Sequence, residues 1–217
     1  MNNLKKNIYS QNGEDGIIEF LLSVLPKDNW CCEFGAWDGK YLSNTFNLVE
    51  NKEYNAVYIE SDSERFKDLI ETSKEYPKIV PVNRLIDLNK NKLDNILSET
   101  NIPYDFDILS IDVDSIDYAI WKSLEKYQPK IVVIEINSSI SPEIILEGDE
   151  LSLENLHSRS GVNFKTCYDL AIDKGYTFMF HTGNMIFIDS KYRNLYVNVP
   201  NENEIFLHFD KKFSLAR

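Results

Sequence analysis

Acidic side chains end four separate apolar runs of the sequence. These side chains, together with one amide, are Glu33, Glu60, Asp112, Asp114, Glu135 and Asn137. A carboxylate that leaves a buried strand must face solvent, a ligand or a cation, because burying it unpaired is costly. An acid at the end of a second strand can also accept the hydroxyls of a ribose, as it does in dinucleotide-binding folds. The pattern therefore predicts a polar site where several strand ends meet.

A glycine-containing turn follows the first of these runs, in Glu33-Phe34-Gly35-Ala36-Trp37-Asp38-Gly39. Glycines at such a place let a ligand approach the backbone closely. The segment lacks the Gly-x-Gly-x-x-Gly spacing of dinucleotide-binding turns. Two interpretations stay open from the residues alone, a ligand-binding loop and a plain strand-to-helix turn.

The elements that must position these residues follow from the apolar spacing. Short apolar runs predict strands at 30–34, 56–59, 79–85, 106–113 and 131–136, and a hairpin from 176–181 and 185–188. Helical spacing predicts helices at 13–25, after a Ser61–Glu64 capping box, at 116–127 and at 164–174. This alternation predicts an α/β fold with a Rossmann-like doubly wound sheet of seven strands and a C-terminal antiparallel hairpin. Ligands of such sheets bind at the carboxyl ends of the strands.

Composition narrows the function classes. The chain has 217 residues and a net charge of −12, which argues against binding nucleic acid or a membrane surface. No apolar run approaches the length of a membrane span, and no signal peptide is expected. Three cysteines, an odd number, suit a reducing compartment, so we expect a cytoplasmic protein. The length and the lack of a linker predict one domain over 1–217.

Several segments together resemble the FkbM-like branch of class I S-adenosylmethionine-dependent methyltransferases. The matching segments are Tyr9-Ser10-Gln11-Asn12-Gly13-Glu14-Asp15-Gly16, the 33–39 turn, Ser43-Asn44-Thr45, Tyr58-Ile59-Glu60, Leu109-Ser110-Ile111-Asp112-Val113-Asp114 and Val133-Ile134-Glu135-Ile136-Asn137. The later segments Gly161-Val162-Asn163-Phe164, Gly175-Tyr176 and Gly183-Asn184 also match. The resemblance covers residues 8–190 and leaves 191–217 as a C-terminal extension. One departure is Ser115, which stands where the family has a glycine after the fourth strand.

The resemblance implies that S-adenosylmethionine lies across the first two strand ends. Glu33 and Gly35 would line its methionine part, Glu60 would accept the ribose hydroxyls, and the 11–15 segment with Asn44 would close over it. The residues implied to bind the cofactor are Gln11, Asp15, Glu33, Gly35, Ala36, Asp38, Ser43, Asn44, Glu60, Ser61 and Asp112.

Methyl transfer to a hydroxyl needs a group that removes its proton. The candidate bases are Asp112, Asp114 and His157, with His181 as a further histidine. A divalent cation is the second route, because it lowers the pKa of an acceptor hydroxyl. Hard oxygen ligands for it would come from Asp112, Glu135 and Asn137. Both routes stay open.

We therefore expect an O-methyltransferase that acts on a small acceptor, a sugar or a nucleotide-sugar of surface glycan synthesis. The alternatives are an N-methyltransferase, an enzyme for a non-sugar small molecule, and a non-catalytic binding module on the same fold. Residues 138–162 form a long connection that we expect to act as a lid. We expect its acidic stretch, 143–154, to be a solvated loop. Within 138–162, Arg159 and His157 are the groups suited to a phosphate or an acceptor proton. A homo-oligomer stays open.

Overall fold

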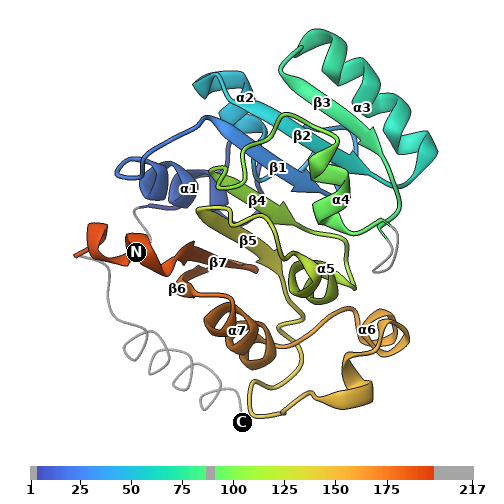
Figure 1. Cartoon of the computed structure of the whole chain (residues 1–217), viewed down its shortest axis with the longest axis vertical. Coiled ribbons are helices and arrows are strands. Elements are labelled where there is room, and N and C mark those ends of the chain that lie inside the picture. The colour runs from blue at the N-terminus through green and yellow to red at the C-terminus, as the bar shows by residue number, and fades with distance from the viewer. Residues whose placement is uncertain (1–3, 87–90, 198–217) are drawn as a thin grey trace.

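A sheet of seven strands forms the centre of the computed structural model, which describes residues 4–86 and 91–197 (Figure 1). The strands are β1 (Trp30–Phe34), β2 (Asn55–Glu60), β3 (Ile79–Asn83), β4 (Ile108–Ile111), β5 (Ile131–Glu135), β6 (Tyr176–His181) and β7 (Asn184–Asp189). Their order is β3-β2-β1-β4-β5-β7-β6, with β1 to β5 parallel and β7 antiparallel to both of its neighbours. The predicted fold class, including the terminal hairpin, is confirmed.

Helices cover both faces of the sheet. The helices are α1 (Glu14–Leu22), α2 (Phe46–Lys52), α3 (Ser63–Glu75), α4 (Leu93–Ser98), α5 (Asp117–Ser123), α6 (Leu153–Arg159) and α7 (Phe164–Asp173), with 3-10 turns η1 (Gly148–Leu151) and η2 (Ser190–Leu195). Buried residues of α1, α2 and α3 pack in one core cluster, and those of α4 to α7 in the other. Successive strand residues point to opposite faces, so Cys31 belongs to the first cluster and Cys32 to the second.

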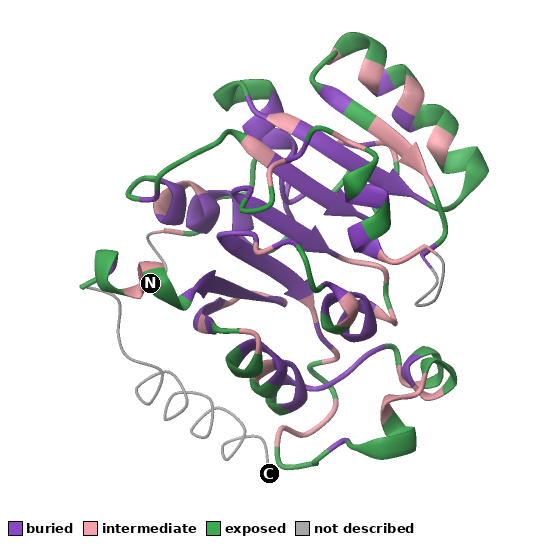
Figure 2. Cartoon of the chain, viewed as in Figure 1, coloured by how far each residue is buried: buried purple, intermediate pink, exposed green. Residues whose placement is uncertain are grey.

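Burial follows from this layering, and the central strands are buried along their length (Figure 2). A parallel strand covered on both faces must be apolar throughout, which is why the near-continuous apolar runs predicted these strands. The described cysteines Cys31, Cys32 and Cys167 are buried and free, and burial raises the pKa of each thiol.

The strand order reverses direction between β1 and β4. β1 pairs with β2 on one side and with β4 on the other, and Phe34 lies in register with Ile111. Residues that follow these two strands therefore diverge from neighbouring points. In open α/β sheets, ligands bind in the crevice at this reversal.

Two local predictions are corrected. The helix after β2 is capped by Asp62, whose carboxylate accepts hydrogen bonds from the backbone N–H groups of Glu64 (2.8 Å) and Arg65 (3.0 Å), not by a Ser61–Glu64 box. Asp ranks among the best caps, so the helix begins one residue later than predicted. The acidic stretch 143–154, predicted to be a solvated loop, contains η1 and the start of α6.

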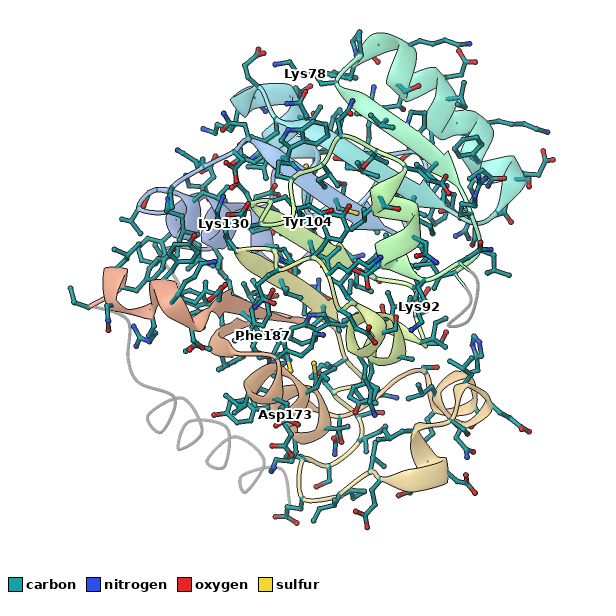
Figure 3. The ribbon with its side chains drawn as sticks, in the orientation of Figure 1. Lys78, Lys92, Tyr104, Lys130, Asp173 and Phe187 are labelled. Atoms are coloured by element: carbon teal, nitrogen blue, oxygen red, sulfur yellow. The ribbon has the colours of Figure 1, made fainter. Side chains whose placement is uncertain are left out.

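The opposite edge of the sheet holds a buried ion-pair cluster. Lys130, which precedes β5 (Figure 3), lies 2.7 Å from a carboxylate oxygen of the fully buried Asp107 and also pairs with Asp28. Asp107 further accepts the backbone N–H groups of Asp28 (3.0 Å) and Asn29 (2.9 Å). The cluster joins the segments before β1, β4 and β5, and so fixes the edge at which those strands begin.

The C-terminal extension is described as far as Val197, and the rest of it lies outside the described residues. Its described part packs back on α1, because the hydroxyl of the buried Tyr196 donates to the carbonyl of Leu21 (2.6 Å). Across 4–86 and 91–197, no helix has the length and apolar character needed to cross a membrane.

Candidate active site

A cavity of about 500 Å³ opens at the carboxyl edge of the sheet. Its walls come from the segment before and at the start of α1, the β1–α2 loop, the residues after β4, the end of β5 and the β6–β7 turn. The cavity thus lies at the reversal of strand order between β1 and β4, and its volume falls within the ~300–1,000 Å³ of small-molecule sites.

Three carboxylates meet on one side of this cavity. One oxygen from each of Asp112, Asp114 and Glu135 lies within 4.8 Å of the other two. Asp112 follows β4 directly and Glu135 ends β5, and these neighbouring strands pair in register at Ile111 and Ile134. The sheet therefore brings together three of the acids that the sequence singled out.

The turn after β4 is held by a fourth carboxylate. Asp117, in the first turn of α5, accepts the backbone N–H groups of Val113 (2.8 Å) and Ser115 (3.0 Å). The left-handed conformation in this turn falls on Asp114 (φ 61°), a residue type that tolerates it. Ser115 is not among the described residues with positive φ, so the turn forms without the glycine that the family has there.

Burial raises the pKa of two of the cavity carboxyl groups, those of Asp112 and Glu135. The pKa of Asp112 rises to about 6, first through burial and then through the charges of Asp114 and Glu14. The pKa of Glu135 rises to about 8, again first through burial and then through its acidic neighbours. A general base works best when its pKa lies near the operating pH, so Asp112 is suited to that role.

Glu14 is a cavity residue that the sequence did not single out. Its side chain is fully buried yet lines the cavity. One carboxylate oxygen accepts the hydroxyl of Thr182 in the β6–β7 turn (2.5 Å), and the other accepts the backbone N–H of Asn12 (2.8 Å). An acid in the first turn of a helix is common because it complements the helix dipole. The sequence therefore offered no reason to distinguish Glu14 from an ordinary helix-start residue.

Of the residues implied to bind the cofactor, the cavity is lined by Gln11, Asn44 and Asp112. Asn44 is buried, and its amide donates to the hydroxyl of Ser110 on β4 (3.1 Å). Gln11 is exposed at the rim formed by the segment before α1. These residues approach the cavity from three separate segments of the chain.

Two acids that were predicted to contact the cofactor, Glu33 and Glu60, instead accept hydrogen bonds from neighbouring loops of the protein. Glu33 is buried, and its carboxylate accepts the hydroxyl of Ser43 (2.7 Å) and the backbone N–H of Thr45 (3.0 Å). Glu60 is also buried, and it accepts the backbone N–H groups of Trp37 (2.9 Å) and Asp62 (2.7 Å). Neither lines the cavity in this structure, and the ribose contact of Glu60 stays a prediction.

Further predicted residues stabilise the adjoining turns. Asp15 is buried, and one of its oxygens accepts the backbone N–H groups of residues 8, 9 and 10 at 2.8–2.9 Å. Asp38 accepts the N–H groups of residues 40 and 41, which closes the turn after β1. Ala36 is buried and donates its N–H to Ile59, whereas Ser61 is exposed.

A glycine is required at position 35 because the backbone after β4 lies very close to it. The φ of Gly35 is 82°, and a Cβ built there would lie 1.9 Å from the backbone carbonyl oxygen of Asp112. Only a residue without a side chain lets the ends of β1 and β4 come this close. Gly35 thus sets the position of Asp112 at the cavity.

The residues of the expected lid lie mostly outside the cavity. His157 is exposed on α6 and does not line it, and Arg159 faces Glu150, bonding its backbone carbonyl. Ser160 and Ser138 do line it, and His181 lies 3.4 Å from the hydroxyl of Ser138. The base role of His157 stays a prediction, and the structure places Asp112 and Asp114 in the cavity.

A divalent cation at this site would find Asp114 better placed than Asn137. Both line the cavity, but the amide oxygen of Asn137 already accepts the N–H of Ser139 (3.0 Å), and its amide nitrogen donates to the carbonyl of Arg159 (2.6 Å). Asp114, in contrast, forms with Asp112 and Glu135 the cluster of three carboxylates that could hold a cation.

The chain matches no protein-family model and no curated protein. Among solved structures, the CurJ carbon methyltransferase is similar with a TM-score of 0.51 and 10% identity, over 83% of this chain and 56% of that one. The glycopeptide N-methyltransferase MtfA, solved with S-adenosylmethionine (TM-score 0.49, 13% identity, 83% and 94% covered), is also found. So is the N-terminal domain of EvdMO1 with S-adenosylhomocysteine bound (0.49, 12%, 83% and 80%).

Similarity at this level of identity concerns the fold. This chain has the Rossmann-like fold of class I S-adenosylmethionine-dependent methyltransferases. It spans just over half of the CurJ structure that it matches. The narrower FkbM-like resemblance stays a prediction.

Proposed function

We propose that this chain is an S-adenosylmethionine-dependent methyltransferase whose small-molecule acceptor binds in the carboxylate-lined cavity. The observation that carries the proposal is the position of that cavity, at the reversal of strand order in a methyltransferase fold, with Asp112 in its wall. A ligand-binding crevice at this place is the rule for such sheets.

The residues present suit the cofactor. S-adenosylmethionine carries a sulfonium and an ammonium group, and the lining carboxylates complement positive charge. Asn44 and Gln11 offer amide groups at the cavity. When bound, the cofactor supplies an activated methyl group.

The protein's own residues orient the acceptor, exclude water and move its proton. Asp112 accepts the acceptor proton, since its raised pKa of about 6 places it near neutrality. Positioning of the acceptor contributes the rest, because the methyl group is already activated.

The sugar acceptor expected from the sequence remains part of this proposal, with one restriction. Among the described residues, the cavity lining includes four carboxylates, Glu14, Asp112, Asp114 and Glu135, and no Lys, Arg or His. A pyrophosphate would be repelled there, and Arg159, which the sequence suggested for it, faces Glu150. A neutral or cationic acceptor therefore fits better than a nucleotide-sugar.

The test compares Asp112→Asn with a matched control, Asp105→Asn, which changes an exposed aspartate before β4 at the opposite edge. Calorimetry measures binding of S-adenosylhomocysteine, and transfer of a labelled methyl group to a panel of amines, sugars and phenols measures activity. We expect cofactor binding by both variants and a loss of turnover of roughly 10²–10⁴ in Asp112→Asn alone.

Two results would contradict the proposal. If the wild-type protein failed to bind S-adenosylhomocysteine, the chain would be a binding module of another kind and not a methyltransferase. Near-normal turnover in Asp112→Asn would show that Asp112 is not the general base. Inhibition by a chelator would separate the cation route from direct proton transfer.

A further inference from the structure

Glu14 is a buried carboxylate with no cationic partner in the described part of the chain. Its side chain has no exposed surface, and its two oxygens bond the hydroxyl of Thr182 and the N–H of Asn12. None of the ion pairs among residues 4–86 and 91–197 includes it. A buried charge is normally paired, because its desolvation is costly.

Buried acids elsewhere in the described chain are satisfied in two ways. Glu33, Glu60 and Asp15 have hydrogen bonds alone, but none of them lines the cavity, whereas Asp107 at the other edge of the sheet has a cationic partner. Asp107 is as deeply buried as Glu14, and Lys130 pairs with it at 2.7 Å. Glu14 has hydrogen bonds but no such partner, and it faces a cavity of about 500 Å³. A positive charge that pairs with Glu14 has room to come from a ligand, either the ammonium and sulfonium groups of the cofactor or the acceptor, and binding measured with S-adenosylhomocysteine already in place reports on the acceptor.

The other charges of the cavity have the same sign. Asp112, Asp114 and Glu135 line it with Glu14, and none of the lining residues within 4–86 and 91–197 is basic. The potential in the cavity is therefore negative on more than one wall.

We propose that the acceptor is an amine, held as a cation against Glu14 and methylated on nitrogen. This inference rests on the proposed methyltransferase function and names its substrate class. Negative surroundings oppose a hydroxyl acceptor, which gains negative charge as it loses its proton. They favour an amine, which gains positive charge as the new bond forms.

The reaction balances without a further reactant. The ammonium group first gives one proton to a cavity carboxylate, which passes it to water. The nitrogen lone pair then forms a bond to the methyl carbon as the carbon–sulfur bond breaks, and sulfur keeps that electron pair. The products are a methylated ammonium ion, S-adenosylhomocysteine and one proton.

The test uses probes of similar size and shape whose polar groups differ in charge. The full chain is saturated with S-adenosylhomocysteine, and saturation-transfer NMR then measures binding of 2-phenylethylamine, 2-phenylethanol and phenylacetate. Glucosamine and glucose form a second matched pair. We expect each amine to bind more tightly than its neutral partner by about tenfold, the scale of a hydrogen bond to a charged group, with phenylacetate weakest.

Two variants assign the preference to the cavity. Glu14→Gln removes the buried charge, and Asp114→Asn is the second variant because asparagine tolerates the left-handed conformation at that position. Glu19→Gln is the control, since Glu19 lies on the same helix but pairs with Lys6 on the outer surface. We expect a reduced preference for amines in the first two variants and an unchanged one in the control.

Several outcomes would overturn the inference: equal binding of amines and alcohols, tighter binding of phenylacetate, no binding by any probe, or an unchanged preference in both cavity variants. Binding of S-adenosylhomocysteine is measured separately. Its absence would refute the methyltransferase proposal, whereas its presence without a preference for amines would refute this inference alone.

Discussion

Replacing Gly35 by alanine tests how the sheet positions Asp112. The new Cβ would lie 1.9 Å from the carbonyl oxygen of Asp112, and real Cβ atoms essentially never come within 3.0 Å of such an atom. The backbone must therefore open by at least 1.1 Å, the difference between 3.0 and 1.9. Because that carbonyl belongs to Asp112, the movement reaches the cavity directly.

The expected cost has two parts. An alanine at φ 82° costs about 1–2 kcal/mol for the left-handed conformation alone. Separation of the β1 and β4 ends adds to this, and a displacement of about 1 Å at a catalytic group can lower the rate ~100-fold. We expect Gly35→Ala to lose both stability and turnover.

Gly175→Ala is the matched control, because Gly175 has φ 79° and no atom within 4 Å of a built Cβ. It carries the conformational cost without the contact. Urea denaturation gives the free energy of unfolding of both variants, and calorimetry gives their affinity for S-adenosylhomocysteine. Equal destabilisation of the two variants, or normal turnover in Gly35→Ala, would refute the reasoning.

Two further predictions concern charge. Lys130→Met leaves Asp107 buried without its cation, so it should lower the free energy of unfolding by about 3–5 kcal/mol. The control Lys165→Met breaks an exposed pair with Asp169 and should lower it by less than about 1 kcal/mol. Similar urea midpoints for the two variants would contradict this prediction. The pKa of Glu135 is raised from 4.5 to about 8, so the folded state binds its proton more tightly than the unfolded chain does. Its contribution to stability is present below pH 4.5 and is lost as the pH rises through 8. The free energy of unfolding of Glu135→Gln should therefore fall less steeply than that of the wild-type protein between these pH values. Parallel curves of unfolding free energy against pH for the two proteins would argue against a perturbed carboxyl group.

The strands could be predicted from the sequence because burial on both faces demands continuous apolar runs. The runs at 30–34 and 131–136 coincide with β1 and β5 to within one residue. The hairpin was predicted for a local reason, the turn residues between two apolar segments. These features depend on neighbours along the chain or on burial alone, and the order of apolar and turn residues in the sequence reveals both.

The partners of strand-end acids could not be predicted. Glu33 and Asp112 both leave the sheet at its carboxyl edge, yet Glu33 bonds the Ser43–Thr45 turn and Asp112 faces the cavity. A carboxylate can satisfy its lone pairs with backbone N–H groups or with a ligand, and residue type does not distinguish these. Glu14 was missed because its contact with Thr182 depends on the packing of distant segments.

The hydrogen bond between Glu14 and Thr182 joins residues that are 168 positions apart in the chain. One wall of the cavity is made early during synthesis and the opposite wall is made after β5, so the two meet only when the hairpin has docked. Contacts of such large sequence separation form late, because the chain between them must be ordered first. An intermediate with β1 to β5 in place would have a sheet but an open crevice. Acquisition of ligand affinity during refolding would therefore mark the docking of the β6–β7 hairpin rather than the formation of the parallel strands.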